Sequence, residues 1–189
     1  MSSLRGPVLM VGAMAFFAVE DALIKTLTAT LPPGEVAISL GIGGGLVFWL
    51  VMLVRGEKLL DLRALKGAVL LRNIAEMGAA MFMILSVALV PLTVVSSLLQ
   101  AMPLAVTMAA AVFLGEKVGW RRWSAILVGF AGVMLILRPG SEGFDSLALI
   151  PLLTVVFLTI RDIATRRVPP GVTSLQLSCW GFLTAIPGG

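Results

Sequence analysis

Long apolar runs separated by short polar stretches dominate the sequence. They predict helices over about residues 7–31, 35–54, 67–90, 92–114, 120–138 and 147–167, and a seventh helix that starts near 172 and is cut off at Gly189. Each of the first six is long enough to cross a bilayer, because about 20 residues at a rise of about 1.5 Å cover an apolar core of about 30 Å. Short connections favour neighbouring antiparallel spans. We therefore predict an all-α membrane protein, a polytopic bundle of transmembrane helices.

Composition supports this class and excludes others. The 189 residues are 59% hydrophobic and 13% charged, whereas a soluble domain has about 45–50% apolar and about 25% charged residues. The net charge of +4 does not indicate nucleic-acid binding, since the basic residues cluster at helix ends. One cysteine and no histidine leave no internal disulfide and no usual zinc cluster, so we expect neither metal nor cofactor. The sequence has no GxxxxGK[ST], HExxH or GxSxG motif, and we expect no enzyme activity.

The basic residues also predict an orientation. If the N-terminus is cytoplasmic, ten of them lie at cytoplasmic helix ends: Arg5, Arg55, Lys58, Arg63, Lys66, Lys117, Arg121, Arg122, Arg166 and Arg167. The opposite side has only Arg138. This bias predicts a multi-pass protein with its N-terminus in the cytoplasm. The first apolar run is too long for a removed signal peptide and is interpreted as a membrane helix.

A short motif occurs twice. Asp21 is followed by Pro-Pro-Gly at 32–34, and Asp162 by Pro-Pro-Gly at 169–171. Five helices separate the copies, so the second runs the opposite way through the membrane, as in an inverted repeat. The alternative is chance recurrence of a common turn. The repeat hypothesis divides the chain into a five-helix unit, 1–140, and the first one to two helices of a second unit, 141–189, which makes the chain a truncated form of a ten-helix protein.

Ionisable side chains within the first helix are candidates for a solute or ion pathway. Asp21 and Lys25 are an i,i+4 pair, with Glu20 beside them. A charge inside a membrane costs at least about 2.5–3.5 kcal/mol and therefore needs a reason. One interpretation is a cavity-lining site that binds a cation or a proton. The other is an internal ion pair, with Lys25 extended toward the interface.

The third predicted helix contains the strongest single candidate, Glu76, near the middle of the membrane. Asn73 lies one turn away and is included in the candidate site. Burial favours the neutral form of a carboxyl group, a condition that proton-coupled carriers use. Arg72 lies close to the predicted cytoplasmic boundary and is interpreted as an interfacial anchor.

Two further helices provide polar candidates. In helix 92–114, Gln100 and Pro103 lie on a polar stripe that either lines a pathway, through a carbonyl freed by the proline, or belongs to a bent helix with Gln100 bonded to a neighbour. In helix 147–167, Asp162 either faces the same central space as Asp21 or lies with Arg161 at the interface as an anchor.

Stripes of small residues, in contrast, indicate close helix packing. They lie at Ala37, Gly41 and Gly45 in helix 35–54, and at Ser97, Ala101, Ala105 and Ala109 in helix 92–114.

The stretch 96–140 carries a family resemblance. An A-x-P-type helix that ends in Leu114-Gly115-Glu116, a short basic loop with a tryptophan, and a glycine-rich helix resemble the end of an EamA-type repeat of the drug/metabolite transporter superfamily. The resemblance implies a bacterial inner-membrane permease with ten helices and a substrate cavity between two bundles. Its members include exporters of amino acids and drugs and importers of vitamins such as riboflavin. The segment Phe17–Lys25 is similar to the vitamin-importing branch.

These observations favour a secondary carrier of small organic metabolites that works by alternating access, with ion or proton coupling. Its distinguishing feature would be convergence of Asp21, Glu76 and Gln100 on one interior space. The alternative is a membrane packing or assembly subunit, or an inactive fragment of a longer permease, with mutually paired charges and no cavity. The expected partners are a small-molecule solute, the lipid bilayer, and either a second copy of the chain or a missing C-terminal half.

Overall fold

The computed structural model of the chain describes residues 5–58, 66–137 and 146–188. In chain order its elements are α1 (Arg5–Leu27), α2 (Pro33–Arg55), α3 (Gly67–Leu89), α4 (Leu92–Leu99), α5 (Met102–Phe113), α6 (Trp120–Leu137), η2 (Ser146–Leu149), α7 (Ile150–Thr165), α8 (Ser174–Ala185) and η3 (Ile186–Gly188). Six segments of this described part are long and apolar enough to cross a membrane, with α4 and α5 forming one of them together. The predicted all-α membrane fold is confirmed. The expected boundary between repeat units at 140–141 lies outside the described residues.

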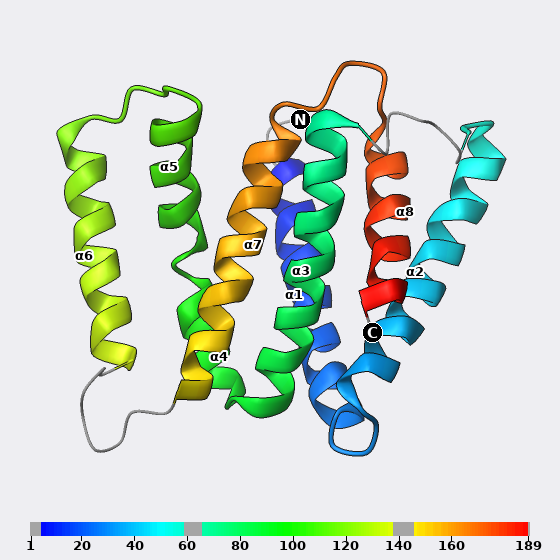
Figure 1. The fold of residues 1–189 in the computed structure, drawn as a ribbon, viewed down its shortest axis with the longest axis horizontal. Coiled ribbons are helices and arrows are strands. Elements are labelled where there is room, and N and C mark those ends of the chain that lie inside the picture. Colours follow the sequence, from blue (N-terminus) through cyan, green and yellow to red (C-terminus); the bar gives the residue numbers. More distant parts are fainter. Residues whose placement is uncertain (1–4, 59–65, 138–145, 189) are drawn as a thin grey trace.

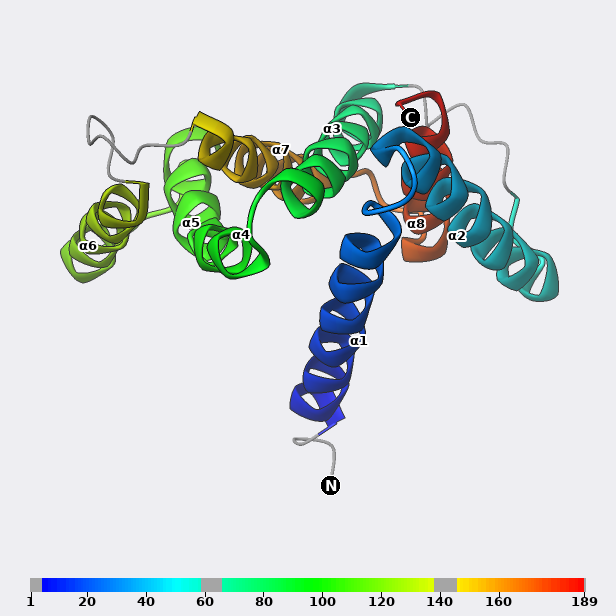
Figure 2. The same cartoon turned by 90° about the horizontal axis from the view of Figure 1, so that it is seen from below.

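Most of the helices form one curved layer, in the order α6, α5, α7, α3, α8 and α2 (Figures 1 and 2). Helix α1 projects from the middle of this layer (Figure 2). Short connections predict that sequential helices are neighbours, but α7 packs between α3 and α5, and α8 packs between α2 and α3. The two last helices are therefore inserted among the earlier ones rather than added at the edge of the layer.

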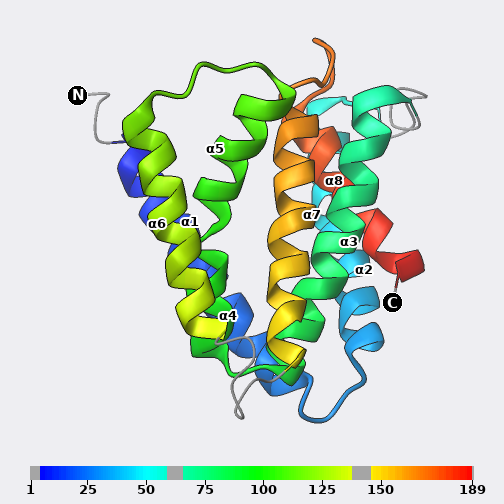
Figure 3. The ribbon, with the colours of Figure 1, turned by 60° about the vertical axis from the view of Figure 1, so that its left-hand side comes forward.

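The segment predicted as one helix over 92–114 is broken into α4 and α5 at Gln100 and Ala101 (Figure 3). The amide of Ala101 bonds the carbonyl oxygen of Leu98 at 3.0 Å, three residues back, instead of continuing the α-helical pattern. The cause is Pro103, which has no N–H to donate to the Leu99 carbonyl and clashes with it. Pro103 occupies the first turn of α5, where a proline is tolerated.

Glycines allow two pairs of helices to approach closely. A Cβ atom on Gly41 would lie 2.9 Å from the carbonyl oxygen of Phe182, and one on Gly45 would lie 2.9 Å from Leu183. The predicted packing stripe of α2 is thus confirmed, and its partner is α8. On α3, a Cβ on Gly78 would lie 2.5 Å from the ring of Phe157 in α7. That ring also stacks on another aromatic ring of α3, so the α3–α7 contact is close and specific.

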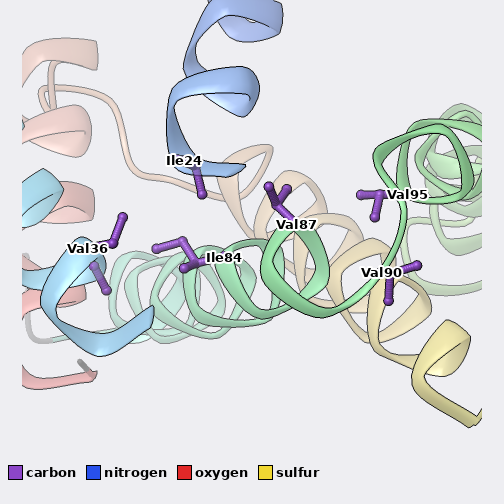
Figure 4. Close-up of a cluster of buried hydrophobic side chains, with 7 residues drawn as sticks. Ile24, Val36, Ile84, Val87, Val90 and Val95 are labelled. Atoms are coloured by element: carbon purple, nitrogen blue, oxygen red, sulfur yellow. The ribbon is translucent and has the colours of Figure 1, made fainter. Parts of the chain in front are cut away.

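A cluster of buried apolar side chains joins the end of α1 to α2, α3 and α4 (Figure 4). Its members are Ile24, Val36, Ala37, Ile84, Val87, Val90 and Val95. Beyond this cluster α1 makes few contacts, since only 6% of the residues in its membrane-spanning stretch are buried. Helix α1 is therefore attached to the layer mainly through its C-terminal turns.

The basic residues that flank the helices gather at one end of the bundle, the upper end in Figure 1. This basic end comprises the end of α2, the start of α3, the α5–α6 connection and the end of α7. Arg166 donates to the Glu116 carboxylate there, and Thr173 donates to the Glu57 carboxylate. Arg63 and Arg138, which also enter the orientation argument, lie outside the described residues.

Candidate functional site

A cavity of about 470 Å³ lies where α1, α2, α3, α7 and α8 converge. Four ionisable side chains line it: Glu20 from α1, Arg72 and Glu76 from α3, and Arg161 from α7. The remaining lining is mostly apolar and consists of Phe17, Ile24, Ala37, Leu40, Phe48, Ala80, Met83, Ile84, Ser178, Gly181, Phe182 and Ala185. A largely apolar cavity with a few convergent charges is the usual form of a small-molecule binding site.

Glu76 lies at the centre of an ion-pair network between α3 and α7. Its Oε2 is 3.0 Å from Arg72 Nη2, and its Oε1 is 3.4 Å from Arg161 Nη1. Arg161 in turn contacts Asp162 Oδ1 at 2.8 Å through Nη2. Glu76 is therefore an ion-pair partner of two arginines in the structure.

The interpretation of Arg72 as an interfacial anchor is wrong. Its side chain is 11% exposed, and its Nη1 donates to the Leu177 carbonyl of α8 at 2.6 Å and to Asn73 Oδ1 at 3.1 Å. Gly181 makes room for this arrangement, because a Cβ there would lie 3.3 Å from Arg72 Nη1 and 3.2 Å from Glu76 Cγ. Arg72 thus ties α3 to α8 beside the cavity.

Asn73 supports the network from below the cavity surface. It is buried at 4% exposure, and its carbonyl oxygen Oδ1 accepts the bond from Arg72. It does not line the cavity. Its role in the structure is to hold the Arg72 guanidinium in place.

The two acidic residues of α1 have different positions. Glu20 is half-buried and lines the cavity, whereas Asp21 does not. Neither carboxylate forms an ion pair or a side-chain hydrogen bond with any residue in the described ranges. Glu20 therefore presents to the cavity a carboxylate that has no partner among the described residues.

Lys25 binds the end of α3 instead of Asp21. Its Nζ donates to the carbonyl oxygens of Val87 at 2.6 Å, Ala88 at 3.3 Å and Val90 at 3.3 Å. The last carbonyls of a helix have no partner within the helix, and a cation near them is favourable. The internal Asp21–Lys25 ion pair, one of the two interpretations of this helix, is not formed; Lys25 instead donates to three carbonyl oxygens at the end of α3.

Gln100 and Pro103 lie away from the cavity. Both are exposed, at the α4–α5 break and in the first turn of α5. The expected convergence of Asp21, Glu76 and Gln100 on one interior space does not occur. The structure instead links Glu76 to Asp162 through Arg161 and to Arg72 within α3, while Glu20 lines the same cavity as Glu76 without being linked to either arginine in the described residues. The signal for both arginines is that each lies next to acidic residues within a membrane-spanning segment.

No cluster of three or more potential metal ligands occurs in the part of the chain that the structure describes. The cavity is lined by guanidinium and carboxylate groups, which can bind polar or charged solutes.

Comparison with known proteins identifies the family of the chain. The EamA-like transporter family matches residues 4–138, and the chain belongs to this family.

Individual relatives differ in what they transport. The chain is 34% identical over 104 residues to a riboflavin transporter of Rhizobium johnstonii, which covers 54% of the chain and 34% of the relative. It is 30% identical over 165 residues to the pseudopaline exporter CntI of Pseudomonas aeruginosa, over 86% of the chain and 57% of the relative. An S-adenosylmethionine uptake transporter of Rickettsia bellii is 30% identical over 77 residues, which is 41% of the chain and 26% of the relative. The matches thus span at most 57% of these three relatives. No solved structure matches the chain.

Proposed function

We propose that the chain acts in secondary transport of a small organic metabolite across a bacterial inner membrane, by alternating access and with ion or proton coupling. The observation that carries the proposal is the cavity between α1, α3 and α7, with charged side chains at a depth where charges are costly. Relatives named as riboflavin, pseudopaline and S-adenosylmethionine transporters support the solute class.

Two features of the cavity suit solute binding. Glu20 has no protein partner in the described residues, and the Nε of Arg72 is buried without a hydrogen-bond acceptor among them. Buried donors normally have a partner, so a water molecule or a solute is the acceptor that this Nε calls for. The mutual pairing of Glu76, Arg72 and Arg161 agrees with a purely structural subunit, but such a subunit has no use for a cavity.

The first test asks whether the cavity holds water. In a Cys179→Ala background, a Ser178→Cys variant places a thiol in the cavity lining. We expect a water-soluble, membrane-impermeant thiol reagent to modify it in membranes opened to both sides. Val156→Cys, on an exposed face of α7 that contacts lipid, should stay unmodified, and Ser174→Cys at the basic end should react. A folded Ser178→Cys variant that does not react would contradict a solute pathway.

The second test measures uptake in proteoliposomes at an acidic and an alkaline pH, with radiolabelled riboflavin and S-adenosylmethionine as probes. Glu76→Gln should abolish the difference between the two pH values, because it removes the carboxylate at the centre of the ion-pair network in the cavity. The matched control is Glu116→Gln, which removes an exposed carboxylate at the basic end. A Glu76→Gln variant that keeps full pH dependence would refute a coupling role for Glu76.

We further propose that the basic end faces the cytoplasm and that the N-terminus is cytoplasmic, since basic residues favour that side. A reporter fused after Pro33 should then report the far side, and one fused after Glu57 the cytoplasm.

Opposite directions of α1 and α7 along the bundle support the inverted-repeat hypothesis (Figure 1). The missing half of the transport unit would be either a C-terminal half of ten-helix type or a second copy of the chain. Crosslinking in membranes distinguishes the two.

A further inference from the structure

A second pocket, of about 390 Å³, lies between α3, α5 and α7, separate from the charged cavity. We name it the α3–α5–α7 pocket. Its walls are apolar except for Thr159, whose hydroxyl is already bonded to the Val155 carbonyl at 2.7 Å, and Arg167. The other lining residues are Gly67, Ala68, Leu71, Ala109, Phe113, Ile160, Ile163 and Ala164.

The pocket extends from the basic end into the membrane-spanning region. Arg167 follows the end of α7, and Thr159 lies eight residues earlier, about 12 Å along the helix axis. Leu71, Phe113 and Ile160 line the pocket and are also exposed. The pocket therefore opens sideways, on the exposed apolar surface of the membrane-spanning helices.

Two basic residues belong to the pocket or adjoin it in the chain, and neither has a carboxylate partner among the described residues. Arg167 lines the pocket and donates through Nη2 to the carbonyl oxygen of Phe113. Lys66 directly precedes the lining residue Gly67. Neither forms an ion pair with a residue of the described chain, whereas the adjacent Arg166 is paired with Glu116. The pocket is therefore positively charged at the basic end, and its interior is apolar.

We propose that the α3–α5–α7 pocket binds an anionic phospholipid of the cytoplasmic leaflet. One acyl chain lies against Leu71, Ala109 and Ile160, and the phosphate lies at Arg167, with Lys66 adding positive charge. Basic pockets between transmembrane helices on the cytoplasmic side are suited to anionic headgroups. A free anion would match the cations but not the apolar walls, and a second protein helix would leave the cations without a partner.

The test uses the whole chain, delipidated in detergent and titrated with phosphatidylglycerol or phosphatidylcholine, with bound lipid counted by native mass spectrometry. We expect tighter binding of phosphatidylglycerol. Arg167→Gln should weaken it about fivefold, and Lys66→Gln with Arg167→Gln should weaken it further, because each basic residue near the headgroup contributes about 1 kcal/mol. Arg167→Lys keeps the charge and should retain most of the binding.

The charge control is Arg121→Gln with Arg122→Gln. This variant removes the same charge from the same end of the bundle, on α6 and away from the pocket. It should keep phosphatidylglycerol binding within about twofold of the native chain. Equal losses in both double variants would indicate diffuse attraction and would overturn the proposal. So would equal binding of the two lipids, or displacement of phosphatidylglycerol by inorganic phosphate.

Pocket filling provides an independent readout that leaves the charges unchanged. Ile160→Trp fills the pocket from an exposed position and should reduce bound phosphatidylglycerol at least fivefold, whereas Val156→Trp, one turn earlier on α7, should not. Both positions are exposed, so both variants should fold, as a monodisperse elution profile checks. Retention of lipid by Ile160→Trp would show that no acyl chain occupies the pocket. Crosslinked dimers at Ile160 would instead identify a second copy as the occupant and contradict the lipid assignment.

Discussion

Helices α1 and α3 have the same length, 23 residues, and both are apolar enough to cross a membrane, yet they are packed in opposite ways. In α3, 33% of the residues in the membrane-spanning stretch are buried, compared with 6% in α1. A Cβ on Gly78 of α3 would meet the ring of Phe157, whereas one on Gly12 of α1 would meet nothing within 4 Å. Apolar character therefore explains why both helices can span the membrane. Close packing of a glycine against a large side chain of a neighbouring helix explains why α3, and not α1, is held within the layer.

The charged groups follow the same division. On α3, Arg72 and Glu76 are fixed by partners from α7 and α8. On α1, Glu20 faces the cavity without a protein partner in the described residues, and the helix is fastened near Lys25. The α3 side of the cavity is thus held by contacts with two other helices, whereas the α1 side is held mainly near one end of its helix.

The largest expected effect comes from breaking the contacts that hold the α3 side of the cavity. Arg72→Leu should destabilise the fold by about 3 kcal/mol, the lower end of the range for breaking a buried pair, because Arg161 still contacts Glu76. The fraction folded after heating in detergent micelles measures this loss. Arg166→Leu removes an arginine from an exposed pair and should cost about 0–1 kcal/mol. Similar losses in the two variants would mean that burial of the α3 network contributes nothing.

The next effect comes from the close contact of α3 with α7. Gly78→Val should cost about 1–3 kcal/mol, because the added methyl groups overlap the ring of Phe157. Gly12→Val is the same substitution at an open position of α1 and should leave the unfolding midpoint nearly unchanged. If Gly12→Val proved as destabilising as Gly78→Val, α1 would have a packing partner where the structure shows open space.

The smallest effect concerns the attachment of α1. Lys25→Met removes the donor to three carbonyl oxygens at the end of α3 and should cost about 1.5 kcal/mol, as expected for a hydrogen bond to a charged group. Lys58→Met, at the exposed basic end, serves as the control and should cost less than about 0.5 kcal/mol. An unchanged melting curve for Lys25→Met would remove Lys25 as the fastening point of α1.

Much of the secondary structure follows from the sequence. The predicted helices 35–54, 67–90 and 120–138 agree with α2, α3 and α6 to within two residues, because their ends coincide with prolines, glycines and charges. The break between α4 and α5 was not predicted, although Pro103 marks it. The segment is apolar throughout, and hydrophobic pattern alone does not distinguish a bent helix from a broken one.

The neighbours of α7 and α8 were beyond sequence reasoning for a different reason. Short connections favour sequential packing, but the decisive contacts are between Gly78 and Phe157 and between Gly41 and Phe182, over 79 and 141 residues of sequence separation. The same holds for the site. Glu76 can be predicted as a site residue because it lies near the middle of a membrane helix. The direction in which the Arg72 side chain points, however, depends on the Leu177 carbonyl, which is 105 residues away in the chain.

The i,i+4 spacing of Arg72 and Glu76 has a consequence for biogenesis. A growing chain presents α3 to the insertion machinery before Arg161 and Leu177 have been synthesised, since these lie 85 and 105 residues downstream. Two opposite charges that already neutralise each other within one helix let that helix pass into lipid as an uncharged unit. When α7 and α8 follow, Arg161 and the Leu177 carbonyl bind to an Arg72–Glu76 pair that has already formed on the surface of α3, and these contacts guide both helices into the layer.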